Sequence, residues 1–79
     1  MATEIIQLTG DPVQLTSGSE TAFISAINGE FCWSDSDDKP VALTISHSEM
    51  KMSVNPPFKI WAWSPATGVM VIVTKRDAD

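Results

Sequence analysis

The acidic run "SDSDDKP" is the part of this chain most typical of a metal site. It places Asp35, Asp37 and Asp38 close together, and calcium binds several oxygen ligands of this kind. The helix–loop–helix calcium motif also requires a glycine and a glutamate at positions that are Pro40 and Ser46 here. The run therefore favours a solvated turn rich in turn-forming residues over a calcium site, and we expect neither a metal ion nor a cofactor.

Two further residues could supply a nucleophile or a general base. His47 is the only histidine and Cys32 is the only cysteine, so an internal disulfide is excluded and a structural zinc site lacks ligands. Hydrolysis would require a nucleophile, a base and an orienting acid, and no G-x-S-x-G motif is present. Reactive cysteines lie in electropositive sites, whereas Glu30 and Asp35 flank Cys32. The sequence predicts a protein that is not an enzyme.

Three tryptophans, Trp33, Trp61 and Trp63, could stack on sugar rings or on bases. Binding to single-stranded nucleic acid needs a cationic groove beside the aromatic rings. The five cations of this chain are scattered, and its net charge is −5, which argues against nucleic acid and anionic membranes as partners. A carbohydrate-binding or host-recognition module with a tryptophan platform is the alternative function. Packing in the core or at a subunit interface is the favoured interpretation.

The opening of the chain and its apolar stretches bear on secretion and membrane insertion. The opening "MATEIIQL" has no basic region followed by a long apolar run, so a signal peptide is not expected. The longest apolar stretch, "GVMVIV", is too short to cross a bilayer. We expect the protein to be made and kept in a cytoplasm, or released from one by lysis.

Short alternating segments separated by turn residues predict an all-β fold. Turn signals recur about every 8 to 12 residues, the spacing of a sandwich or barrel, and no segment has helical periodicity. We predict one domain over residues 1–79, a compact antiparallel sandwich or small jelly-roll-like barrel of seven or eight strands. The expected strands are residues 4–9, 13–16, 21–28, 30–34, 41–47 and 50–54, followed by a hairpin over 58–75 and a frayed tail at Arg76–Asp79.

Turn residues predict how some of these strands connect. Asn28-Gly29 is a strong hairpin signal, and "SPATG" predicts the turn of the last hairpin. Val41, Leu43 and Ile45 should point inward, and the change of phase after them predicts a tight turn or bulge at Ser48-Glu49. Pro56-Pro57 should end the strand before it.

The C-terminal hairpin "FKIWAWSPATGVMVIVTK" is apolar on both of its faces. A two-layer sandwich buries only one face of each sheet, and the acidic loop at 34–40 is a poor cover for tryptophan. We therefore expect a second copy or another protein to cover the other face. The expected seam is Trp61, Trp63, Met70 and Ile72; with the faces reversed it would be Phe58, Ile60 and Val71.

The pattern as a whole resembles small β-structured virion proteins of tailed bacteriophages. In these, a segment of the form "G…v.w..s…P" precedes a closing "lWa.s..g…v.vt" hairpin. The matching residues are Gly29, Trp33, Ser34, Pro40, Ile60, Trp61, Ala62, Ser64, Gly68, Val71, Val73 and Thr74. The resemblance implies no catalytic or ligand residue. It implies a structural protein of the virion.

In such a role the protein would decorate and stabilise a capsid, or form a module of a tail or fibre, commonly as a trimer. Its partners would be copies of itself and the major capsid or tail proteins. Ala2–Thr9 could act as an extended arm that adds a strand to a neighbour's sheet, through Glu4, Ile5, Ile6 and Leu8. The rest of the domain should then fold without residues 2–9.

Overall fold

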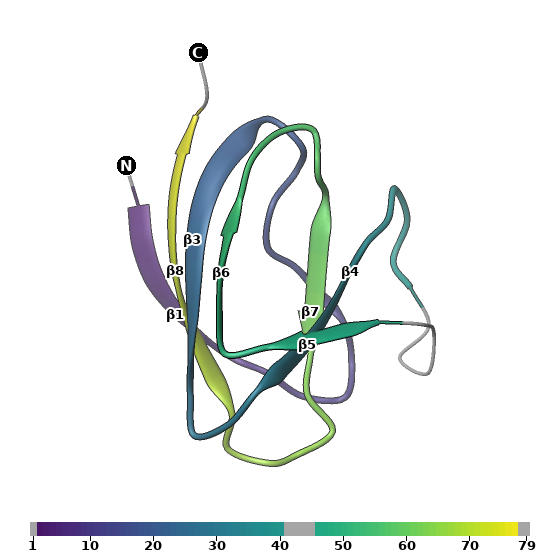
Figure 1. Cartoon of the computed structure of the whole chain (residues 1–79). Helices are drawn as coiled ribbons and strands as arrows, with labels where there is room; N and C mark the ends of the chain where they lie inside the picture. Colours follow the sequence, from purple (N-terminus) through teal and green to yellow (C-terminus); the bar gives the residue numbers. More distant parts are fainter. Residues whose placement is uncertain (1, 41–45, 78–79) are drawn as a thin grey trace.

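The computed structural model describes residues 2–40 and 46–77, which form two antiparallel sheets packed face to face (Figure 1). Sheet A contains, in spatial order, β1 (Ala2–Gln7), β8 (Met70–Asp77), β3 (Glu20–Ile27) and β6 (Lys51–Val54). Sheet B contains β2 (Val13–Gln14), β7 (Ile60–Trp63), β4 (Phe31–Asp35) and β5 (His47–Glu49). The predicted all-β sandwich is confirmed.

The core lies between the two sheets and is filled by alternate residues of the strands. On β8, Val71 and Val73 are buried, whereas Ile72 between them is exposed. Because side chains alternate across a strand, one face of each sheet points into the core. The buried cluster also includes Leu8, Leu15, Ala22, Ile24, Phe31, Val54, Ile60, Ala62 and Val69.

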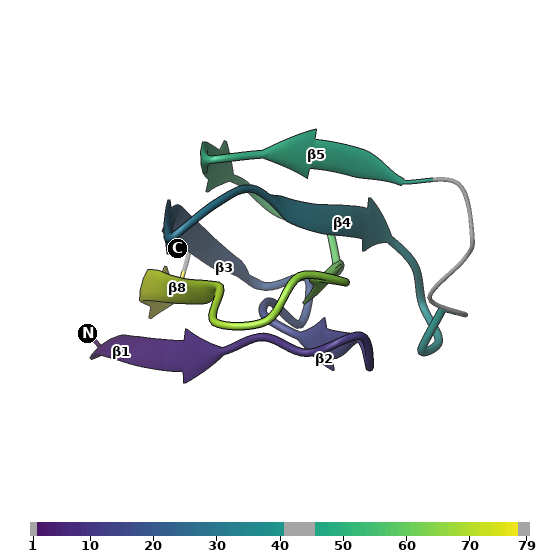
Figure 2. The ribbon, with the colours of Figure 1, turned by 90° about the horizontal axis from the view of Figure 1, so that it is seen from below.

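Two corners join the edges of the sheets. On one side the chain runs from β1 toward β2 (Figure 2): Leu8 N donates to Val69 O at 2.9 Å, and Thr9 O accepts from Ser64 N at 2.8 Å. This segment therefore passes from sheet A to the end of β7 in sheet B. On the other side the chain bends at Met50 between β5 and β6, where Ala26 N donates to Met50 O at 2.7 Å. These corners give the sandwich partly barrel-like sides.

The predicted C-terminal hairpin is wrong, because β7 belongs to sheet B and β8 to sheet A. The turn at "SPATG" does form, with Gly68 at a φ of +84°. Asn28 and Gly29 also form a turn, with φ values of +70° and +136°, but it too joins a strand of one sheet to a strand of the other. Both turns carry the chain across the core, so the strands that they connect face each other instead of pairing.

Two smaller expectations also differ from the structure. Arg76 and Asp77 are not a frayed tail, because they pair with Thr21 and Glu20 as the end of β8. The segment expected to turn at Ser48-Glu49 is strand β5, and the bend follows it at Met50. Val41, Leu43 and Ile45 lie outside the described residues. Among the described residues, no helix is long and apolar enough to cross a membrane.

Candidate interaction surface

The outer face of sheet A carries a group of exposed apolar side chains. Ile5 is 58% exposed, Phe23 50% and Ile72 36%. The next residue along each strand points the other way. Ile24, next to Phe23, and Val73, next to Ile72, are fully buried. The exposed residues therefore lie on the side of the sheet that faces away from the core.

Strand register brings these residues into neighbouring rows. Ile5 lies opposite Ile72, which in turn lies opposite Ser25. In the next row Met70 lies between Gln7 and Ile27, and both Met70 and Ile27 are half-buried.

A third row places Thr74 between Thr3 and Phe23. The hydroxyl oxygens of Thr3 and Thr74 are 3.0 Å apart, which confirms that these two side chains share a face. The apolar group of Ile5, Phe23, Ile27, Met70 and Ile72 is thus contiguous across three strands.

Charge is distributed unevenly over this face. At the outward positions of the described strands of sheet A there is no acidic residue, although the whole chain has ten acidic residues against five cations. Lys51, opposite Ser25, and Arg76, opposite Thr21, are the two charges at its margin. We call this surface, apolar at its centre and cationic at its margin, the outer face of sheet A.

The predicted seam does not exist as one surface. Met70 and Ile72 lie on the outer face of sheet A, but Trp61 and Trp63 lie on β7 of sheet B. Ile60 and Ala62, between the tryptophans, point into the core. Trp61 and Trp63 therefore face away from the core on the opposite side of the molecule. In the reversed seam, Ile60 and Val71 are buried core residues, and only Phe58 is exposed.

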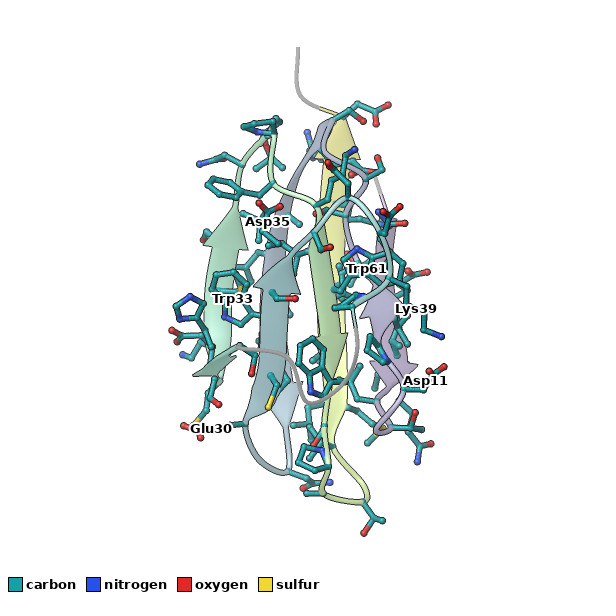
Figure 3. All side chains as sticks on the ribbon, turned by 90° about the vertical axis from the view of Figure 1, so that its right-hand side faces the viewer. Asp11, Glu30, Trp33, Asp35, Lys39 and Trp61 are labelled. Carbon is teal, nitrogen blue, oxygen red and sulfur yellow. The ribbon has the colours of Figure 1, made fainter. Side chains whose placement is uncertain are left out.

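The two tryptophans of β7 are also poor candidates for a sugar platform. Trp63 is only 3% exposed and Trp61 is half-buried. The indole N–H of Trp61 donates to Ser36 O at 2.9 Å, so the segment after β4 lies against it (Figure 3). The acidic loop, expected to be a poor cover for tryptophan, thus covers part of Trp61.

Exposed ion pairs accompany this cover. Lys39 Nζ is 2.8 Å from Asp11 Oδ1, and Lys59 Nζ is 3.1 Å from Asp37 Oδ1. Ser36 Oγ donates to Asp38 O at 2.6 Å, and Asp35 accepts from Lys59 N at 2.6 Å. Asp35 and Asp37 thus contact the backbone N–H and the ammonium group of the same residue, Lys59, while Asp38 takes part through its backbone carbonyl. Among the described residues, no three potential metal ligands lie together.

His47 and Cys32 do not meet in a catalytic arrangement. The imidazole of His47, an exposed residue, lies against the Trp33 ring with centroids 4.7 Å apart, because the two residues are opposite each other on β5 and β4. The Cys32 sulfur lies 3.9 Å from Ser48 Oγ. Trp33 itself packs against the core, so these groups serve packing at the edge of sheet B.

A groove opens between β6, the middle of β4 and the start of β7. It has a volume of about 310 Å³ and is lined mainly by Trp33, Met52, Val54, Phe58 and Ile60. Phe58, at its rim, is 49% exposed. The groove is apolar and small, at the lower end of the range for ligand sites. Neither His47 nor Cys32 lines it.

The expected partner-binding arm is part of the domain. Ala2–Gln7 forms six consecutive pairs with β8, and Leu8 is buried in the core. Ile6 packs against the core, whereas Glu4 and Ile5 are exposed. Removal of residues 2–9 would therefore strip an edge strand and a core side chain from the domain. Strand addition to a partner remains a prediction, and it would use the free edge of β1.

Phe23 and Ile27 were not expected to belong to an interaction site. The signal was present, because the segment 21–28 alternates between two apolar sets, Phe23 with Ile27 and Ile24 with Ala26. Only the pairing of β3 with β8 shows that the first set joins Ile72 on one outer face.

Comparison with known proteins adds no assignment: no protein-family model, no curated protein and no solved structure matches this chain.

Proposed function

We propose that this protein is a structural component of a tailed-phage particle, which self-associates and binds a capsid or tail surface as a decoration protein. The outer face of sheet A is the observation that supports this proposal. Ile5, Phe23 and Ile72 leave a contiguous apolar area bare, and such areas on small soluble domains are typical of protein–protein contacts.

The proposed mechanism is binding free energy without covalent chemistry. A subunit that binds only the assembled shell or tail stabilises that assembly by mass action. The described residues suit this task better than catalysis, because His47 contacts Trp33, Cys32 contacts Ser48, and the carboxylates of Asp35 and Asp37 are held by Lys59. The protein would be made in the host cytoplasm and carried in the virion, with the major capsid or tail proteins as partners.

The resemblance to phage proteins enters this proposal as support from sequence alone, and the trimer that it implies is not part of the proposal. An experiment on particles tests the proposal directly. Particles of the phage that encodes the chain would be purified by density-gradient banding and washed, and their proteins quantified by mass spectrometry. We expect this chain in the band at a copy number comparable to that of known structural proteins. Its recovery only in the soluble lysate would overturn the proposal.

A further inference from the structure

We infer that the outer face of sheet A packs against the same face of a second copy of this chain. This inference rests on the proposed self-association and adds to it the surface, the partner and the symmetry. A contact between identical faces is made by a two-fold pair, so the unit of association is a dimer and not the trimer that the resemblance implies.

Charge argues for a second copy as the occupant. The chain has a net charge of −5, so two copies repel each other in most orientations. The side of sheet B exposes Asp11, Asp35, Asp37 and Asp38, which would meet carboxylates of another copy. The outer face of sheet A has no described acidic residue at its outward positions. Two copies can therefore approach through this face without repulsion between carboxylates.

The two cations at the margin of the outer face of sheet A are also compatible with a contact between two copies. Lys51 and Arg76 are both exposed and lie outside the apolar centre, where long side chains keep their charged ends in water. Asp77 follows Arg76 at the end of β8 and pairs with Glu20 of β3. By strand alternation Asp77 and Glu20 point to the other side of the sheet, so they lie near Arg76 without entering the contact.

The area of the outer face of sheet A sets the expected affinity of the dimer. Strands lie about 4.8 Å apart, and outward residues recur about every 6.6 Å along each strand. Three rows on four strands therefore make a face of roughly 400 Å² per copy before side-chain relief is counted. A pair would bury roughly 1,000 Å² in total, at the low end of specific interfaces. We expect a reversible dimer with a dissociation constant in the micromolar range or weaker.

Two phenylalanines of matched exposure provide the test. Phe23, at the outer face of sheet A, is 50% exposed, and Phe58, at the groove, is 49% exposed. Phe23→Lys and Phe58→Lys make the same chemical change on different surfaces. Ile5→Lys, on the edge strand, is a second disruption of the outer face. Light scattering during size exclusion, over a range of concentrations, measures the mass of each variant, and circular dichroism checks that each is folded.

We expect the wild-type mass to rise with concentration toward twice 8.6 kDa. Phe23→Lys and Ile5→Lys should weaken association at least tenfold, and Phe58→Lys should leave it unchanged. Should Phe23→Lys fail to fold, an NMR dilution series on the wild type replaces it: amide shifts should change around Ile5, Phe23 and Ile72 and not around Phe58.

Three outcomes would overturn the inference. Loss of association in Phe58→Lys but not in Phe23→Lys would assign the contact to the groove. A mass of three times 8.6 kDa would exclude the two-fold pair but would leave self-association standing. A monomer at all concentrations up to about 1 mM, far above a micromolar dissociation constant, would exclude both, and the content of purified particles would then decide the structural role by itself.

Discussion

The two outer faces of the sandwich differ in how far their apolar side chains are exposed to solvent. On sheet B, the large rings of Trp61 and Trp63 face away from the core, yet Trp63 is 3% exposed and Trp61 is half-buried. On sheet A, Ile5 and Phe23 also face away from the core, and half or more of each side chain is exposed. The bulkier residues are the hidden ones.

At Trp61, the difference arises from a connection and not from the strands. After β4 the chain turns back over sheet B, where Ser36 O accepts the indole N–H of Trp61 and Lys39 reaches Asp11. At Ile5 and Phe23, the exposed fractions show that no comparable cover lies over sheet A. The outward apolar positions of sheet A are therefore left exposed where the chain's own loops do not cover them.

Truncation of one aromatic residue on each face should give the largest contrast in stability. Trp63→Ala removes a buried ring and should lower the free energy of unfolding by about 3 to 5 kcal/mol. Phe23→Ala removes a half-exposed ring and should lower it by less than about 1 kcal/mol. Urea unfolding followed by circular dichroism, at concentrations low enough to keep the chain monomeric, measures both. Equal losses for the two variants would mean that the faces do not differ as described.

Sequence reasoning recovered the strands well but not their pairing. Alternation in 69–73 correctly placed Val69, Val71 and Val73 on one face, because burial imposes a two-residue period on a strand. The same alternation is found whether two strands joined by a turn pair edge to edge or face each other across the core. Asn28-Gly29 and "SPATG" specify a reversal of the chain, and only long-range contacts decide which sheet the next strand joins.

The same limit applies to the candidate site. Met70 and Ile72 were predicted to be outward, and they are, but their expected neighbours Trp61 and Trp63 belong to the other sheet. Their actual neighbour Ile5 is more than 60 residues away in the chain and is brought to β8 by the register of β1. The acidic composition of 34–40 also concealed its role, because a backbone carbonyl, that of Ser36, makes the contact with Trp61.

Replacement of single indole groups tests the cover over sheet B more finely. Trp61→Phe removes the N–H that donates to Ser36 O, and Trp33→Phe removes an N–H that is buried without a partner among the described residues. Both changes remove a similar volume from a half-buried ring. We expect Trp61→Phe to be the more destabilising by about 1 kcal/mol, since only it breaks a hydrogen bond. Urea unfolding measures the difference.

Amide hydrogen exchange locates that effect. Exchange should become faster after Trp61→Phe in the segment that follows β4, and it should stay unchanged there after Trp33→Phe. If both variants open this segment equally, the indole hydrogen bond does not hold the cover in place, and packing of the ring alone would account for it.

The ion pair between Lys39 and Asp11 should have the smallest effect. The two side chains are 51% and 72% exposed, and pairs of this kind contribute about 0 to 1 kcal/mol. Asp11→Asn should therefore lower the free energy of unfolding by less than about 0.5 kcal/mol. The loss should vanish in about 1 M salt, where exposed charges are screened over a few ångströms. Asp38→Asn, which changes a carboxylate next to Lys39 that lies outside both ion pairs, is the control. A loss that persists in high salt would mean that Asp11 holds the loop by more than charge, and the cover over Trp61 would then depend on two anchors instead of one.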